Sequence, residues 1–144
     1  MILRSLAAAI VASLVTLLAC DTDGMFGSPT ELAEGTWGGE DAGVIVTATS
    51  AHVHVGCTNG DFPAPIDLDE DGRFSVAGDY LVTAHPVAVG PTMPARLAGV
   101  VERGTLVLTV AVNDTIADEL VVLGPVAVRL GQDPQLGPCP ICVM

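Results

Sequence analysis

No lysine occurs in this chain of 144 residues, and its basic side chains other than histidine are five arginines. Seventeen aspartates and glutamates oppose them, so the formal net charge is −12 at pH 7. A protein this acidic repels polyphosphates, and we therefore exclude nucleic acid as a partner. The glycines are dispersed and form no phosphate-binding loop, so we also expect no cofactor.

Aromatic residues and helical periodicity are both scarce. Only 3% of the residues are aromatic, and no segment repeats apolar residues every 3.6 positions over three turns. The 16 glycines and 10 prolines, beside many valines and threonines, favour strands joined by tight turns. We predict an all-β domain of about eight strands, first as a small antiparallel up-and-down β-barrel and alternatively as a two-sheet sandwich.

The sequence also lacks a recognisable catalytic set. Ser28, Ser50 and Ser75 lie in no nucleophile elbow, and local context suggests no Ser-His-Asp arrangement. Nothing singles out two of the many carboxylates as a hydrolytic pair. We therefore predict that the protein is not an enzyme.

The N-terminus reads as an export signal. Arg4 precedes an apolar run over residues 6–19, which is broken only by Ser13 and Thr16. As a helix this run would span about 21 Å, too short for a hydrocarbon core of about 30 Å, and its layout is typical of a secretory signal peptide. We expect residues 1–19 to be removed.

The end of this signal, Leu17-Leu18-Ala19-Cys20, resembles the lipobox of bacterial lipoprotein precursors. The resemblance implies that the Cys20 thiol receives a diacylglyceryl group and that its amine then receives a further acyl chain such as palmitate. Two chains suffice for stable anchoring in a lipid bilayer. We therefore expect an extracytoplasmic protein on the bacterial cell membrane or outer membrane, with the choice between the two left open.

Behind the anchor we expect a flexible tether over residues 20–34 and a folded body over residues 35–144. Asn59-Gly60 is typical of a tight hairpin turn, and Gly78 and Asp79 suggest a bulge within a strand. Strand patterns cover the segments 44–49, 51–57, 64–68, 73–82, 96–103, 105–113 and 118–130.

Several pieces of the body are similar to a family of small uncharacterised bacterial lipoproteins. This resemblance implies the fold and the anchor but no activity. Gly35-x-Trp37 is also similar to the opening of lipocalin- and avidin-like barrels, which implies a ligand at the barrel mouth near Trp37, whereas a Trp that plugs the barrel end is the alternative. The matching pieces are GTWGGEDAGVIVT (35–47), Cys57 before a turn, LDEDGRF (68–74), GDY (78–80), PARLAGVV (94–101) and LVLTVAVNDT (106–115).

Besides Cys20, three cysteines remain, an odd number for an oxidising compartment. A Cys57–Cys139 disulfide would close about 83 residues and constrain the unfolded chain by about 4.5 kcal/mol, and pairing Cys57 with Cys142 would give nearly the same value. Loop entropy therefore leaves the partner open. The family resemblance implies Cys139, which leaves Cys142 free or intermolecular. A Cys139–Cys142 redox pair is disfavoured because no helix follows it.

Two groups could bind metal. His52 and His54 point to one side of a predicted strand, and His85 could complete a zinc site, although solvated histidines explain the pattern as well. Asp67, Asp69 and Asp71-Gly72 match half of a calcium loop, but a hairpin turn selects the same residues.

Two functions follow as hypotheses. The first is a membrane-anchored lipoprotein whose small acidic β-domain is a structural or interaction module for an envelope protein. The second is a barrel that binds a small ligand near Trp37 or a metal ion at the histidines.

Overall fold

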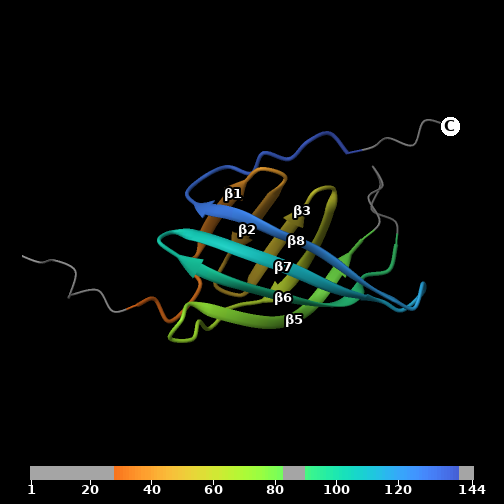
Figure 1. Cartoon of the computed structure of the whole chain (residues 1–144), viewed down its shortest axis with the longest axis horizontal. Coiled ribbons are helices and arrows are strands. Elements are labelled where there is room, and N and C mark those ends of the chain that lie inside the picture. Colours follow the sequence, from red (N-terminus) through yellow and green to blue (C-terminus); the bar gives the residue numbers. More distant parts are fainter. Residues whose placement is uncertain (1–27, 83–89, 140–144) are drawn as a thin grey trace, which may run out of the picture.

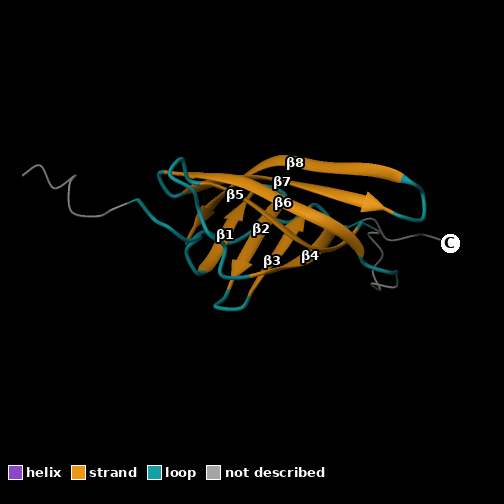
Figure 2. Ribbon diagram, turned by 90° about the horizontal axis from the view of Figure 1, so that it is seen from below, coloured by secondary structure: helices purple, strands orange, loops and turns teal. Residues whose placement is uncertain are grey.

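Eight antiparallel strands form one closed barrel in a computed structural model that describes residues 28–82 and 90–139. Each strand pairs with the next along the chain, and β8 closes the barrel on β1 (Figures 1 and 2). The predicted up-and-down barrel is therefore confirmed, and the sandwich is wrong. The strands are β1 (Gly35–Gly39), β2 (Ala42–Val46), β3 (Ser50–Val55), β4 (Thr58–Pro63), β5 (Arg73–Leu81), β6 (Met93–Glu102), β7 (Thr105–Asp114) and β8 (Glu119–Leu130).

Alternating apolar residues fill the inside of the barrel. On β7, Leu106, Leu108, Val110 and Val112 are fully buried, whereas Val107 between them faces outward. This is the two-residue period of a strand that presents one face to a core. The other large side chains buried in the interior include Trp37, Phe62, Tyr80, Leu97, Val44, Val53 and Val128.

The predicted turn at Asn59-Gly60 is wrong, because the hairpin turns earlier. Val55 pairs with Thr58, so the turn is Gly56-Cys57, and Asn59 and Gly60 lie inside β4. Gly60 is needed there because a Cβ at this position would overlap the ring of Tyr80, which lies against it from β5. The glycine serves close packing between strands, not a turn.

The predicted short strand over 64–68 is absent, and this segment instead pairs with the end of the expected tether. Glu31 and Asp67 form an antiparallel bridge, and the amide of Leu32 donates to the carbonyl of Ile66 at 2.9 Å. Leu32 and Ile66 are both buried. The packed part of the chain thus begins a few residues before Gly35.

The bulge predicted at Gly78 and Asp79 is also wrong. β5 pairs with β6 without a shift from Arg73 to Tyr80, whereas the pairing of β7 with β8 shifts between Leu108 and Val110, where β8 has one additional residue. A Cβ at Gly78 would overlap the backbone and ring of neighbouring β4, so this glycine again permits a close approach.

Beyond β8 the chain runs back over the outside of the barrel, and we call residues 132–139 the strap. Gln135 pairs with the β1–β2 turn through hydrogen bonds from its amide to the carbonyl of Gly39 and from the amide of Asp41 to its carbonyl. Side chains at Gly38 and Gly43 would overlap the strap. The strap ends in a Cys57–Cys139 disulfide, which confirms the pairing that the family resemblance implies.

Candidate functional site

The barrel mouth near Trp37 is closed by this side chain. Trp37 is 2% exposed, and its indole Nε1 donates a hydrogen bond to the carbonyl of Ala33 at 3.0 Å. The segment before β1 therefore holds the ring in place. This arrangement matches a plug at the barrel end, because an indole that faced a ligand would keep its surface free.

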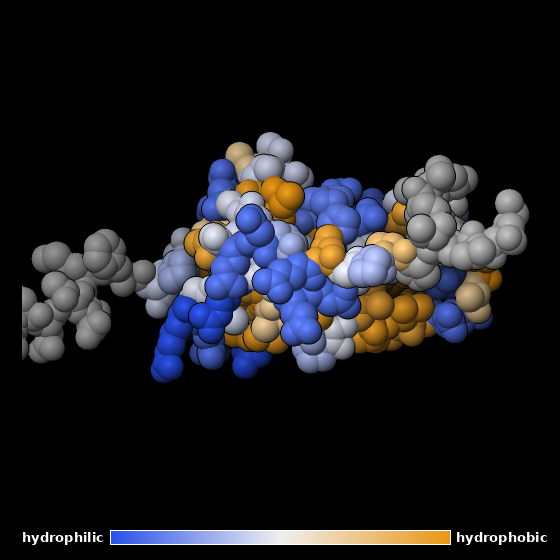
Figure 3. All heavy atoms as spheres, turned by 90° about the horizontal axis from the view of Figure 1, so that it is seen from above, coloured by the Kyte–Doolittle hydropathy of each residue, from blue (hydrophilic) through white to orange (hydrophobic). Residues whose placement is uncertain are grey.

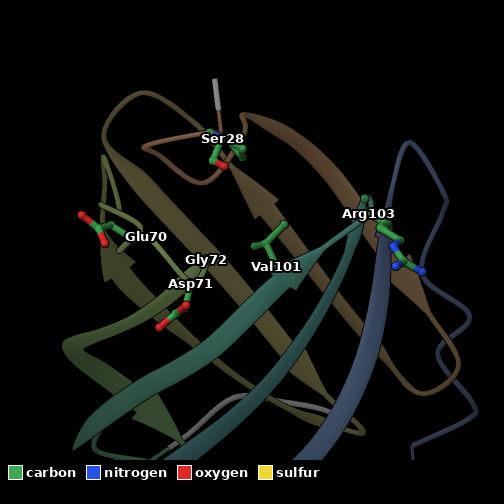
Figure 4. A pocket seen from close by; sticks show the side chains of 8 residues that line it. Ser28, Glu70, Asp71, Gly72, Val101 and Arg103 are labelled. Carbon is green, nitrogen blue, oxygen red and sulfur yellow. The ribbon is translucent and has the colours of Figure 1, made fainter. Parts of the chain in front are cut away.

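A surface hollow of about 410 Å³ lies where the β4–β5 loop and the β6–β7 turn meet the chain before β1 (Figure 4). Val101 points into its middle, whereas the charged groups of Glu70, Asp71 and Arg103 point in different directions (Figure 4). A specific ligand site needs polar groups that converge. The hollow therefore lacks the set of converging polar groups that would indicate a specific ligand.

The aspartate-rich segment before β5 is a turn. Oδ1 of Asp69 accepts hydrogen bonds from the amides of Asp71 and Arg73 at 2.9 and 2.8 Å. Gly72 takes the left-handed conformation that closes the loop, with φ at 73°. These are the contacts of an aspartate that organises its own backbone. They support the turn interpretation over the calcium loop.

His52 and His54 lie on the outer face of β3, as the alternation predicts, and both are half-buried. Their Nε2 atoms are 2.9 Å apart, and the two rings meet edge to face at 71°. On the other side of the first ring, Nδ1 of His52 lies 2.7 Å from Oδ1 of Asp61. A carboxylate and two imidazoles thus form one continuous series of hydrogen bonds, which we call the histidine pair with Asp61.

The electrostatics of this group differ between its members. Partial burial lowers the pKa of His54, and the neighbouring His52 lowers it further, whereas Asp61 acts in the opposite direction. A lowered pKa favours the neutral imidazole at pH 7. His54 can then use the free electron pair of a ring nitrogen.

Sequence reasoning found the two histidines but missed Asp61. The carboxylate reaches His52 because the two residues are direct cross-strand partners on β3 and β4. Because the hairpin turn was predicted at Asn59-Gly60 and not at Gly56-Cys57, Asp61 was assigned to the turn and its pairing with His52 was not recognised. Among residues 28–82 and 90–139, no cluster of three or more metal-binding side chains occurs. Three predicted residues lie outside the described part of the chain: the third metal ligand His85, the lipidation site Cys20 and the remaining thiol Cys142.

A second notable surface is the end of the β7–β8 hairpin. Ile116, Leu120 and Val122 are 74, 67 and 56% exposed, and we call these three residues the apolar tip. In the space-filling view a hydrophobic area lies at the lower right, on the side of β7 and β8, and hydrophilic residues stand between it and the far right end (Figure 3). Oδ1 of Asp114 accepts hydrogen bonds from the amides of Ile116 and Ala117, both at 2.9 Å, so the turn itself is ordered.

The fold and these surfaces define a small closed β-barrel with a filled interior and features on its outer wall. Comparison of the chain with family models, curated proteins and solved structures finds no significant match. The family resemblance therefore stays a prediction. Within the described residues, no helix has the length and apolarity needed to cross a membrane.

Proposed function

We propose that this protein is a lipid-anchored interaction module that binds an envelope protein through the apolar tip of its β7–β8 hairpin. The observation that carries the proposal is the exposure of three large apolar side chains on an ordered turn, in a barrel whose inside is already filled. Exposed apolar groups that cluster are typical of interaction sites. The anchor at Cys20 supplies the location.

The position of the tip suits this role. The chain enters the barrel at the end formed by the β4–β5 loop and the β6–β7 turn, and the hairpin tip lies at the opposite end (Figures 1 and 2). Ten residues of β7 separate the two ends, which corresponds to about 30 Å. An anchor before the barrel would thus hold the apolar tip away from its attachment point.

Charge around the tip specifies the partner's chemistry. Asp114, Asp118 and Glu119 flank the apolar side chains, and no arginine lies between residues 104 and 128. Anionic lipid headgroups would be repelled by these carboxylates. The complementary surface is an apolar groove rimmed by lysine or arginine, in which the hairpin inserts and the rim charges set its orientation.

The ligand-barrel alternative has less support. The interior positions of the strands carry buried side chains, and Trp37 closes one end. A ligand inside the barrel would have to displace these side chains and create a cavity, at a cost of about 2–5 kcal/mol for each large residue moved.

Site-specific photo-crosslinking in intact cells tests the proposal. A photoreactive residue at Leu120 should give one defined adduct, whereas the same residue at Ile45, which is 48% exposed on β2, should give none. Replacing Val122→Glu in the Leu120 variant should abolish the adduct, because a carboxylate would enter the apolar groove. An adduct of twice the chain mass, equal adducts at both sites, or an adduct that survives Val122→Glu would overturn the proposal.

The anchor is tested separately. A Cys20→Ser variant should lack the acyl mass and leave the membrane fraction, while its barrel keeps the same near-ultraviolet spectrum. An unacylated wild-type chain in the soluble fraction would contradict the anchor without affecting the proposal for the tip.

A further inference from the structure

We propose that His52 and His54 chelate a late divalent transition-metal ion, best Cu²⁺, and that Asp61 positions the first of these ligands. The proposal rests on the outer wall of β3 and β4 and is independent of the function proposed for the hairpin tip. It needs no third protein ligand, because water completes the coordination of an ion that two imidazoles hold.

The Nε2 atoms of His52 and His54 already lie close together on the outer face of β3. Nε2 of His52 and Nε2 of His54 lie 2.9 Å apart and share a hydrogen bond, so both nitrogens are close enough to bind one metal ion placed beside the line that joins them. Alternate residues of a strand point to the same face, so β3 fixes this juxtaposition without a flexible loop. A bound ion would replace the hydrogen bond: the proton of His54 moves from Nε2 to Nδ1, and both rings rotate so that their Nε2 electron pairs point to the ion.

The spacing distinguishes between metals. Two imidazole nitrogens at about 2.0–2.1 Å from an ion stand about 2.9 Å apart at a right angle and about 3.3 Å apart at the tetrahedral angle. The observed 2.9 Å, which the hydrogen bond between the rings sets, matches the right-angle spacing without moving the two nitrogens apart. Right-angled nitrogen pairs suit the tetragonal geometry of Cu²⁺ and Ni²⁺, and Cu²⁺ binds most tightly in the order of divalent ions. Zn²⁺ in a tetrahedral site would require the two rings to move apart.

Asp61 supplies the outer contact that such a site uses. Its Oδ1 lies 2.7 Å from Nδ1 of His52, so the proton of that ring stays on Nδ1 and leaves Nε2 free for the ion. Carboxylates in this position fix the tautomer and orientation of a ligating histidine, and their loss typically weakens metal binding 10- to 100-fold. The register of β3 and β4 builds the contact into the sheet.

The neighbouring side chains leave room for the water ligands. The flanking outward positions are Ile45 and Gly43 on β2, which pair with His52 and His54, and Asn59 on β4, which also pairs with His54. The strap packs over Gly43 through Pro134 and thereby bounds the site on one side. The histidine pair is thus half-buried, but one side remains open to solvent.

Copper binding to the purified full-length chain tests the proposal, with Cu²⁺ alone as the probe and glycine as the competing chelator. We expect one Cu²⁺ per chain and an electron paramagnetic resonance spectrum with hyperfine splitting from two nitrogens. His54→Gln and His52→Gln should each abolish this two-nitrogen signal. Asp61→Asn should weaken binding 10- to 100-fold.

The matched control is Asp79→Asn. Asp79 is the cross-strand partner of Asp61 on β5, is exposed, and carries the same charge without touching a histidine in the described structure. It should leave copper affinity within about twofold, as expected for a screened surface charge. Circular dichroism and Trp37 fluorescence check that each variant folds. Absence of one-to-one binding, a signal that persists in His54→Gln, equal losses for both aspartate variants, or tighter binding of Zn²⁺ than of Cu²⁺ would overturn the proposal.

Discussion

The two halves of the barrel wall are built differently. β1 to β4 are five or six residues long, whereas β5 to β8 run for nine to twelve. The short half gains additional support from the strap, which crosses the outside of β1 and β2 and ends in the disulfide at the β3–β4 turn. The long half has long ladders and large buried leucines, and it extends past the short half at the hairpin tip (Figure 1).

The outer surfaces differ accordingly. On the short half, glycines at positions 38 and 43 let the strap lie directly on the sheet, and the histidine pair with Asp61 stands beside it. On the long half, β5 and β6 carry exposed polar residues such as Arg73 and Arg96, whereas outward positions of β7 and β8 include the exposed apolar residues Val107 and Leu120. One closed ladder thus has a strap over the outside of its short half and exposed apolar residues on β7 and β8 of its long half. Three predictions test this comparison.

The largest effect is expected from the disulfide. Replacing Cys57→Ser together with Cys139→Ser should lower the free energy of unfolding by up to about 4.5 kcal/mol, because the unfolded chain regains the freedom of a loop of about 83 residues. Urea denaturation followed by the fluorescence of Trp37, the single tryptophan, measures this loss.

Hydrogen exchange of the same double variant shows which part of the barrel loses stability. Hydrogen exchange should quicken first at the amides of Asp41 and Gln135, which join the strap to the β1–β2 turn, and last in the β6–β7 ladder. Uniformly faster exchange in both halves would show that the strap stabilises the whole barrel and would remove the distinction between its walls.

A smaller loss is expected from the core of the long half. Leu97 is fully buried on β6 between Val76 and Val110, and Leu97→Ala should cost about 3 kcal/mol through lost burial and a residual cavity. Val107→Ala, on the outer face of the same sheet, is the control and should cost less than about 1 kcal/mol. Similar losses for the two variants would mean that the outer face of β7 is packed in solution, contrary to its exposure here.

Sequence reasoning reached the fold because alternation is a local property. Leu106 to Val112 alternate without interruption, and this pattern alone distinguishes the inside of β7 from the outside. The same reasoning failed at Gly60 and Gly78, and it did not predict how the strap packs on β1 and β2, for a common reason. Each of these depends on a partner far along the chain, such as Tyr80 for Gly60, and no local pattern contains it.

The candidate sites were predictable to different degrees. The His52–His54 spacing is visible in the sequence, but Asp61 joins it only through the strand register, which a misplaced turn of about three residues had concealed. The apolar tip was not predicted, because the alternation of β8 marks its side chains without showing that they extend beyond the barrel. The strand register and the length by which a hairpin extends beyond the barrel both depend on the whole closed sheet, so a local sequence pattern does not show them.

The smallest effect is expected at one of the two seams between the halves, where Tyr80 of β5 meets β4. The Tyr80 hydroxyl lies 2.9 Å from Oγ1 of Thr58, and the ring is buried against Gly60. Burial raises the pKa of Tyr80 above its ordinary value of 10.0, whereas the hydrogen bonds to Thr58 and to the Val55 backbone act in the opposite direction. The neutral phenol is therefore the form that the folded barrel favours.

The sign of the pH dependence follows from this shift. Because the pKa is higher in the folded protein than in the unfolded one, the stabilisation is fully present below pH 10 and is lost as the pH rises through the folded value. The chain has no lysine and no second tyrosine, so few other groups titrate in this range. The absorbance of tyrosinate during a rapid pH jump should therefore show a midpoint above 10 for the folded protein and near 10 in urea.

Tyr80→Phe provides the control for this seam. It should remove the alkaline loss of stability and cost about 1 kcal/mol at pH 7, the contribution of one hydrogen bond. If the tyrosinate midpoint of the folded protein lay at 10 or below, the seam would be open to water. At this seam the two halves would then be joined only by the backbone ladder of β4 and β5, which pairs Asn59–Asp61 with Asp79–Leu81, whereas the pairing of β1 with β8 forms the other seam. A raised midpoint instead shows that side-chain packing across this short ladder joins the two halves into one core.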